Sequence, residues 1–183
     1  DTAKIAVSAY CGDNYFSENT KEALERILKI AKEHGIKTLV AGPAFGSGRY
    51  GFACVEVCHS ISTSLGLDCV TAMHGENPGV GSYQQYKDRK VFLFPTSDAV
   101  TGMEDALLKM AQSLKKLALG STLGSAPEEG YIPRGLRVED MVSDSGAKRA
   151  VNMLLNKVTG HHFVSEIPID KIEAMPVAPQ ITN

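Results

Sequence analysis

Short apolar runs and longer stretches of helical period alternate along the first 120 residues of the chain. Four runs of mainly apolar residues predict buried strands: 4–10, 38–41, 67–73 and 91–94. Three stretches with apolar residues at every third or fourth position predict helices: 19–34, 52–65 and 101–119. Strands that alternate with helices favour a parallel sheet with helices on both faces. We therefore predict an α/β fold, a three-layer αβα domain with a mainly parallel, Rossmann-like or flavodoxin-like sheet.

The ends of the predicted helices carry local signals. Asn19, with Glu22 three residues later, has the spacing of a capping box at the start of the first helix. A glycine follows each of the three helices, at Gly35, Gly66 and Gly120, where a left-handed residue commonly ends a helix.

The pattern changes after residue 120. Residues 121–142 show no period, and 144–158 have the apolar spacing of a last helix. The remaining tail contains three prolines, which favour extended backbone: Pro168, Pro176 and Pro179. We predict an α/β domain over residues 1–160. Residues 161–183 would form an extended carboxyl-terminal tail or linker to a second half that is not present in this chain.

Composition excludes several classes of function. The chain has 183 residues and a net charge of −2, which favours neither nucleic acid nor a membrane surface as a partner. No apolar run approaches the length of a transmembrane helix. Without a secretory signal, the four cysteines are expected to be reduced thiols in a cytoplasm, and no metal site is expected because Cys54 and Cys58 lack a second ligand pair.

The segment 42–51 is the strongest candidate for a binding site. It follows a predicted strand, opens a predicted helix and reads Gly-Pro-Ala-Phe-Gly-Ser-Gly-Arg-Tyr-Gly. Backbone N–H groups near Gly48 would lie at a helix N-terminus, where they favour an anion, and Arg49 can grip a carboxylate with two hydrogen bonds. The spacing Gly46-x-Gly48-x-x-Gly51 also matches a dinucleotide fingerprint, but no acidic residue ends the next strand. A small-carboxylate site is favoured; glycines that only let a tight loop turn are the other alternative.

Three loops leave the carboxyl ends of predicted strands and should converge on one crevice: 11–18, 42–51 and 74–82. His74 and Glu76 could form an acid/base pair, although the turn 76–79 could equally hold solvated side chains. Aromatic residues near these loops could be packing residues or a box for a quaternary ammonium group. The candidates for substrate binding are Asp13, Asn14, Gly48, Arg49, Tyr50, His74, Glu76 and Asn77.

A fourth motif covers residues 129–135, Glu-Gly-Tyr-Ile-Pro-Arg-Gly. Its charged residues fit either an exposed loop or a strand that makes a contact, and the loop is the preferred interpretation. Taken with three other segments, this motif carries a family resemblance. The four segments are 11–16, 41–51, 76–79 and 129–135. In order and spacing they resemble the selenoprotein subunit of component B of the glycine, sarcosine and betaine reductases.

The resemblance implies reductive cleavage of a C–N bond in the cytoplasm of an anaerobic bacterium. The substrate would be glycine, sarcosine or betaine; the amine is released, and a carboxymethyl group passes to a selenoprotein carrier, component A. No cofactor is expected in this chain. The resemblance places a selenocysteine in a carboxyl-terminal half outside residues 1–183 and a carbonyl group on another component B subunit. The catalytic residues are therefore expected outside this chain.

A second function remains open at the level of sequence. The chain could be a small-carboxylate binding or regulatory domain without chemistry of its own. The residues do not choose among the three amines, because acceptors for N–H groups and aromatic rings for a quaternary ammonium are both present.

Overall fold

The computed structural model describes residues 4–135 and 144–162. The chain divides into two compact units, Asp1–Arg137 and Val138–Asn183. The first carries the sheet, and the second contains the helix α7 (Gly146–Val158). The predicted boundary after residue 160 stays a prediction, and nearly all of the predicted tail, from residue 163 on, lies outside the described residues.

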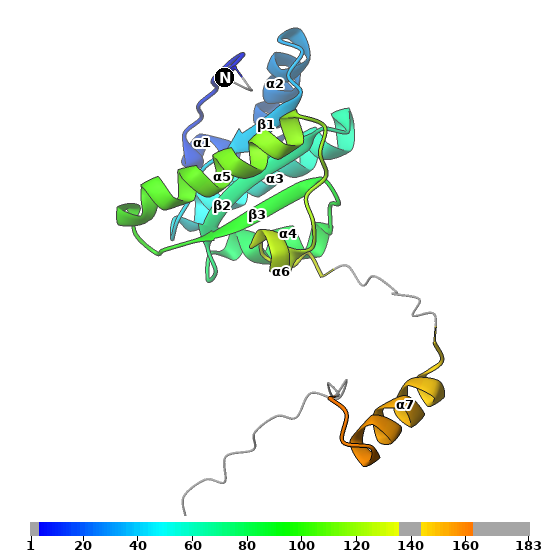
Figure 1. Ribbon diagram of the computed structural model, residues 1–183. Helices are drawn as coiled ribbons and strands as arrows, with labels where there is room; N and C mark the ends of the chain where they lie inside the picture. Colours follow the sequence, from blue (N-terminus) through cyan, green and yellow to red (C-terminus); the bar gives the residue numbers. More distant parts are fainter. Residues whose placement is uncertain (1–3, 136–143, 163–183) are drawn as a thin grey trace, which may run out of the picture. The chain divides into compact units, whose positions relative to one another are not determined.

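A parallel sheet forms the centre of the first unit (Figure 1). Its strands are β1 (Thr38–Ala41), β2 (Asp68–His74) and β3 (Val91–Thr96), in the order β1-β2-β3. In the register, Thr38 lies opposite Asp68, and Cys69 opposite Val91. This arrangement confirms the predicted α/β fold.

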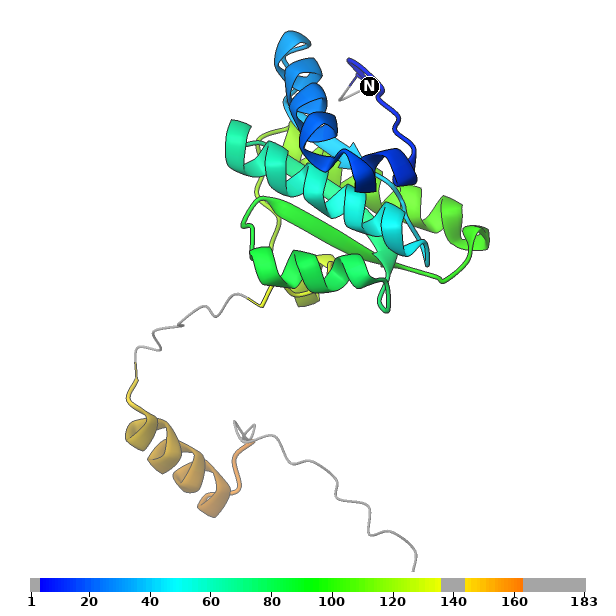
Figure 2. The same cartoon turned by 180° about the vertical axis from the view of Figure 1, so that it is seen from behind.

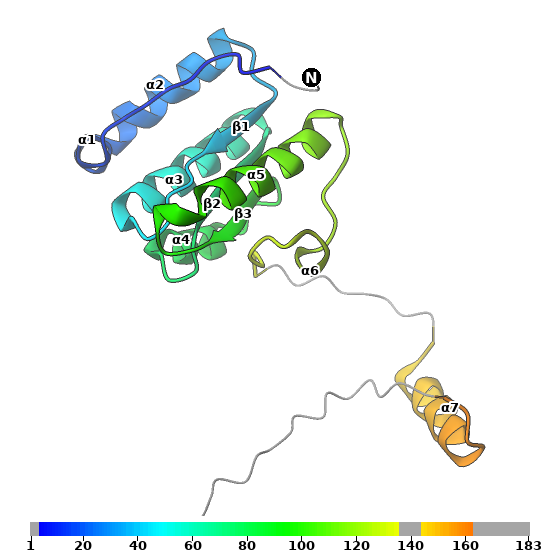
Figure 3. The same ribbon diagram turned by 60° about the vertical axis from the view of Figure 1, so that its left-hand side comes forward.

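Helices cover both faces of the sheet. The helices α3 (Gly48–Leu65) and α4 (Pro78–Tyr86) lie side by side on one face (Figure 2). Helix α5 (Met103–Ala118) crosses the other face, with α3 behind the strands (Figure 3). Successive side chains of β2 point to opposite faces of the sheet and so belong to two separate apolar clusters. Cys69 and Met73 pack under α3, while Val70 and Ala72 pack under α5.

Two helices precede the sheet, α1 (Asp13–Glu18) and α2 (Thr20–Glu33). Asn19 lies at the N-cap position of α2, as predicted, but its side chain caps nothing and the predicted capping box does not form. Its amide nitrogen donates to the Tyr15 carbonyl instead, and Glu22 accepts from the Tyr15 hydroxyl at 3.1 Å. The Asn19 N–H, which the box would have paired with the Glu22 side chain, donates to the Tyr15 carbonyl of α1 at 2.9 Å.

Three predicted elements are wrong. The loop predicted over 11–18 is mostly helix α1. Residues 4–10 form no strand and are largely exposed, because an apolar run specifies a strand only when a partner edge is paired with it. The loop predicted over 74–82 is mostly helix α4, which has Asn77 at its N-cap and Pro78 at N1. Proline is well suited to that first helical position, since its missing N–H would have no partner there.

The motif at 129–135 runs along the outer edge of β3. After the 3-10 helix η1 (Val100–Gly102), α5 and the short helix α6 (Ala126–Glu129), the chain returns so that the Ile132 N–H donates to the Leu93 carbonyl at 2.7 Å. Tyr131 is buried, and the Tyr83 hydroxyl donates to the Ile132 carbonyl at 2.9 Å. The preferred interpretation as a loop is confirmed for residues 130–135, which form neither helix nor strand, but the loop is partly buried against β3 and not exposed throughout. Across residues 4–135 and 144–162, no helix has the length and apolar character needed to cross a membrane.

Candidate functional site

The loop between β1 and α3 is fixed to the end of β2 by backbone hydrogen bonds. The Ala44 N–H donates to the Ala72 carbonyl at 2.8 Å, and the His74 N–H donates to the Phe45 carbonyl at 3.0 Å. Phe45 has a φ of 48°, a left-handed conformation that a residue with a side chain rarely adopts. The loop therefore has one defined path at the carboxyl edge of the sheet, where ligands bind in folds of this class.

Helix α3 begins in this loop with an open N-terminus. Ser47 occupies the N-cap position and its side chain makes no capping hydrogen bond. Arg49 lies in the first turn with 66% of its side chain exposed, and its Nε is 3.2 Å from Oδ2 of Asp13. The other carboxylate oxygen of Asp13 accepts from the Asn14 N–H at 2.9 Å. The ion pair joins the first turn of α1 to the first turn of α3, within two of the three segments that were predicted to converge.

Asn77 joins the third loop to the second. It is 3% exposed, and its amide nitrogen donates to the carbonyls of Phe45 at 2.9 Å and Ser47 at 3.0 Å. Its amide oxygen accepts from the Gly79 N–H at 2.9 Å, which caps α4. The three segments are thus connected through Arg49–Asp13 and through Asn77. The shared edge of the sheet accounts for the second and third, which follow β1 and β2, whereas the segment 11–18 follows no strand.

The contact between His74 and Glu76 involves the backbone N–H of Glu76 and not its carboxylate. The Glu76 N–H donates to Nδ1 of His74 at 3.4 Å, and the Glu76 side chain is exposed. This contact makes Nδ1 the acceptor, so the neutral ring carries its proton on Nε2. Their role as an acid/base pair stays a prediction.

The three glycines of the fingerprint-like pattern each allow a close approach to another segment. A Cβ on Gly46 would lie 3.2 Å from the Asp98 carbonyl oxygen, and one on Gly48 would lie 3.1 Å from Cγ of Pro78. A Cβ on Gly51 would lie 2.2 Å from the amide oxygen of Asn77. Packing within the protein accounts for all three, so the pattern gives no support to nucleotide binding.

A line of polar side chains leads from the site into the core. Tyr50, which is 39% exposed, lies beside the buried thiol of Cys54, and Cys54 lies beside the buried hydroxyl of Thr71. Burial raises the pKa of Cys54 to about 12, although the nearby hydroxyl groups of Tyr50 and Thr71 act in the other direction. Burial also raises the pKa of Tyr50. Cys54 is therefore a neutral thiol at neutral pH and no nucleophile.

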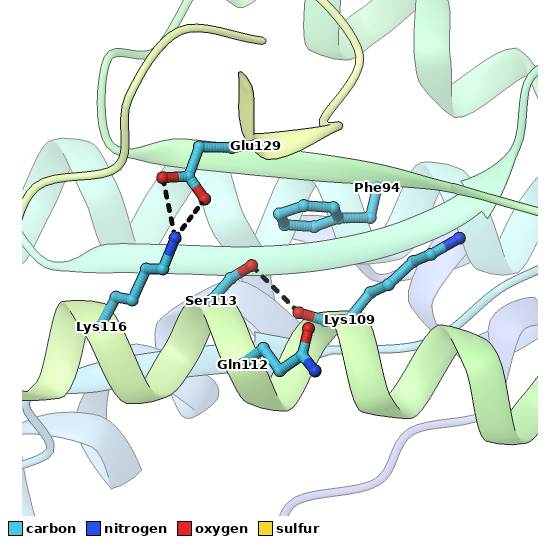
Figure 4. Close-up of a pocket in the computed structure, with 6 residues that line it drawn as sticks. All are labelled: Phe94, Lys109, Gln112, Ser113, Lys116 and Glu129. Atoms are coloured by element: carbon cyan, nitrogen blue, oxygen red, sulfur yellow. Dashed lines mark hydrogen bonds and ion pairs between the residues drawn. The ribbon is translucent and has the colours of Figure 1, made fainter. Parts of the chain in front are cut away.

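A small hollow lies elsewhere, between α5 and the end of α6 (Figure 4). Its volume is about 80 Å³, smaller than usual ligand pockets. The Lys116 ammonium there is paired with Glu129 at 2.7 Å, and Lys109 with Asp105 at 2.7 Å. None of the predicted site residues lines it.

Comparison with known proteins identifies the family. All 183 residues match the family model described as glycine/sarcosine/betaine reductase selenoprotein B (GRDB). The chain belongs to this family. The match agrees with the resemblance carried by the four motifs, three of which contribute to the connected loops.

Other members of the family include parts of three reductase complexes. The chain is 41% identical, over 99% of its length, to the glycine reductase complex component B subunit gamma of Carboxydothermus hydrogenoformans. It is 33% identical to the sarcosine reductase complex component B subunit beta and 34% identical to the betaine reductase complex component B subunit beta of Peptoclostridium acidaminophilum, over its whole length and 99% of it. In each case the chain spans 41% of the relative's length. No solved structure matches the chain.

Two helix starts in the site have clear signals in the sequence. The Asn77-Pro78 pair is a helix-start signature, with a good N-cap followed by proline at N1, and it foretells α4. Ser47 also precedes the helical stretch as an N-cap residue would. No local sequence pattern predicts that both amide N–H groups of Asn77 are hydrogen-bonded, because the accepting residues are 30 and 32 positions away.

Proposed function

We propose that this chain is the substrate-binding part of a selenoprotein reductase component B. The complex would cleave the C–N bond of glycine, sarcosine or betaine reductively, release the amine and pass a carboxymethyl group to a selenoprotein carrier, component A. Membership of the family supports the reductase assignment. The observation that carries the binding role is the exposed Arg49 at an uncapped helix N-terminus, on the edge where three loops meet.

Arg49 and α3 would hold the substrate carboxylate. The contact with Asp13 uses Nε, so neither terminal nitrogen of the guanidinium makes a hydrogen bond or ion pair with the described residues. Those two nitrogens form the fork that a carboxylate fits. Asp13 would then orient the guanidinium rather than touch the substrate, and the first N–H groups of α3 would add donors of the right polarity.

The amine end of the substrate would face the neighbouring polar and aromatic groups. Glu76, His74 and Asn14 offer acceptors for N–H groups, while Tyr50 and Phe52 present partly exposed rings. A quaternary ammonium such as that of betaine binds aromatic faces, whereas glycine requires acceptors. Both kinds of group are available, so the proposal covers the substrate class and not one amine.

The bond cleavage would depend on groups outside these 183 residues. The family assignment implies a selenocysteine in a carboxyl-terminal half and a carbonyl group on a second component B subunit, within a cytoplasmic complex. The residues of this chain would bind and orient the substrate, and Cys54, with its raised pKa, is unsuited to replace a selenol.

The test is Arg49→Lys in the assembled reductase complex. Lysine keeps the charge and loses the fork, so binding of the cognate substrate should weaken by about 1–3 kcal/mol in calorimetry. Arg89→Lys is the matched control, because Arg89 is exposed and lies two residues before β3, at the opposite edge of the sheet. Unchanged affinity in Arg49→Lys would refute the carboxylate role.

A second measurement separates the enzyme from a binding module. Release of ammonia, methylamine and trimethylamine is followed in the same complex with glycine, sarcosine and betaine. Release of one amine, reduced in Arg49→Lys, supports the reductase and names its substrate. Tight carboxylate binding without release of any amine would favour the alternative, a binding or regulatory domain.

A further inference from the structure

We infer that Asn77 is a positioning residue, which sets the affinity for the carboxylate by holding the N-terminus of α3 in place without touching the substrate. The inference rests on the proposed function, since it concerns the same site. It replaces the direct substrate contact predicted for Asn77 from the sequence.

The hydrogen bonds of Asn77 leave it no donor for a ligand. A primary amide has two N–H groups, and both are used by the carbonyls of Phe45 and Ser47 at 2.9 and 3.0 Å. The amide oxygen accepts from Gly79 at 2.9 Å. With 3% of the residue exposed, the amide is enclosed by the two loops that it connects.

The two carbonyls lie where the loop most requires support. Phe45 is held at a φ of 48°, a strained conformation that persists only when its surroundings impose it. Ser47 is the residue from which α3 starts, and its carbonyl also accepts the Gly51 N–H at 2.8 Å. By binding both carbonyls, Asn77 fixes the direction in which the first N–H groups of α3 and the Arg49 side chain leave the loop.

The close approach of the two helices keeps Asn77 in this place. Its amide lies directly over Gly51, where a Cβ would come within 2.2 Å of the amide oxygen. A Cβ on Gly79, in the neighbouring helix, would come within 2.8 Å of the Gly51 carbonyl carbon. The amide therefore has little room to rotate, and any side chain at position 51 would displace it.

Asn77→Asp separates the two functions of the amide. Aspartate is as good an N-cap as asparagine, so the bond from Gly79 and the start of α4 should survive. The carboxylate, however, sets an oxygen against the carbonyls of Phe45 and Ser47, and both donated bonds are lost. Asn77→Ser is the second variant, because serine also caps a helix and carries no amide donors.

Local hydrogen exchange in the full-length protein is the first readout, and it does not depend on any activity. In Asn77→Asp the Gly51 amide, bonded to Ser47, should exchange on the order of tenfold faster, as for loss of one net hydrogen bond. The Gly66 amide, bonded to Ser62 at the other end of α3, should be unchanged. Tyr83→Phe is the matched control on α4: it removes the hydrogen bond to Ile132 and should leave the Gly51 amide unchanged.

Steady-state kinetics of amine release by the assembled complex are the second readout. Asn77→Asp should raise KM by on the order of tenfold with kcat little changed, the signature of lost substrate binding. Gly51→Ala, which keeps the asparagine but displaces it, should raise KM in the same way. Tyr83→Phe should leave KM unchanged.

The outcomes distinguish this inference from the proposed function. Unchanged exchange at Gly51 in both Asn77 variants overturns the positioning role. A raised KM in Arg49→Lys together with normal KM in Asn77→Asp also overturns it, while the carboxylate site stands. Normal KM in both Arg49→Lys and Asn77→Asp, with faster exchange at Gly51, removes the proposed carboxylate site, and with it the part of the inference that concerns affinity.

Discussion

Gly79 of α4 lies against the backbone of Gly51 of α3, with no room between them for a side chain. A Cβ on Gly79 would be 2.8 Å from the Gly51 carbonyl carbon and 2.9 Å from both its oxygen and Sδ of Met73. Neither the backbone nor the packed thioether can move away easily. The crossing of α3 and α4 is therefore set by two glycines, and the same crossing places the N-terminus of α3 beside the loop 74–77.

The first prediction follows from this contact. Gly79→Ala should lower the free energy of unfolding by about 1–3 kcal/mol, the usual cost of an overpacked core, as measured by urea denaturation. Gly81→Ala is the matched control in the same helix, because a Cβ there meets nothing within 4 Å. Alanine at that exposed helical position should instead stabilise the protein by about 0.5–1 kcal/mol. Equal effects of the two substitutions would refute the packing argument.

The elements of this fold that bury one face were predictable from the spacing of apolar residues along the chain. The spacing in 101–119 places α5 within a residue or two, and the apolar runs around 38–41, 67–73 and 91–94 give the three strands, because each of these elements buries the face that its pattern marks. The start of α4 was predicted as a loop because its sequence, Asn-Pro-Gly, contains proline and glycine, which usually indicate a turn.

The candidate site was predictable as a location and not as a set of contacts. Parallel strands bring the loops after β1 and β2 to one edge, so the order of elements alone predicts that 42–51 and 74–79 lie together. Individual hydrogen bonds such as Asn77 to Phe45 join residues 32 positions apart, and no local pattern encodes them. The left-handed Phe45 is likewise imposed by tertiary contacts and contradicts the preference of its own residue type.

The second prediction concerns the thiols. Cys11 is exposed, whereas Cys54, Cys58 and Cys69 are buried. Burial raises the pKa of Cys54 from 9.0 to about 12, which lowers its thiolate fraction at pH 8 by about a thousandfold. A hydrogen bond with Cys69, together with burial, raises the pKa of Cys58.

Iodoacetamide should therefore modify only Cys11 in the native protein and all four thiols in urea, as read by peptide mass mapping. Cys11→Ser is the control and should remove the native-state labelling. Rapid alkylation of Cys54 before unfolding would contradict the assignment of that thiol as buried and neutral.

The third prediction tests the edge motif at residues 129–135. The Arg134 guanidinium carbon lies 4.9 Å from the ring centre of Phe92 and 5.2 Å from that of Tyr131, and the guanidinium donates to the Tyr131 hydroxyl at 3.2 Å. Arg134→Lys loses the planar stacking and part of the hydrogen bonding, so it should destabilise the protein by about 1–2 kcal/mol. Arg89→Lys is the control, because Arg89 is exposed and should change stability by less than about 0.5 kcal/mol. An unchanged free energy of unfolding in Arg134→Lys would show that the motif does not stabilise β3.

The last prediction is a dependence of stability on pH in the alkaline range. The hydrogen bond from the Tyr86 hydroxyl to the Glu56 carboxylate raises the pKa of Tyr86 from 10.0 to about 12, with burial as a smaller cause. Because the folded state holds this proton more tightly than the unfolded state, the stabilisation is fully present below pH 10 and is lost as the pH rises through 12.

Glu56→Gln tests this dependence, because the neutral amide can still accept the hydrogen bond but no longer opposes ionisation of the phenol. Absorbance titration should then show one tyrosine whose pKa moves down toward 10, and the unfolding free energy should fall less steeply between pH 10 and 12 than in the parent. Cys54 titrates in the same window, so Cys54→Ala serves as the control that leaves the tyrosine shift in place. Identical tyrosine titrations in the parent and in Glu56→Gln would show that the carboxylate does not control Tyr86.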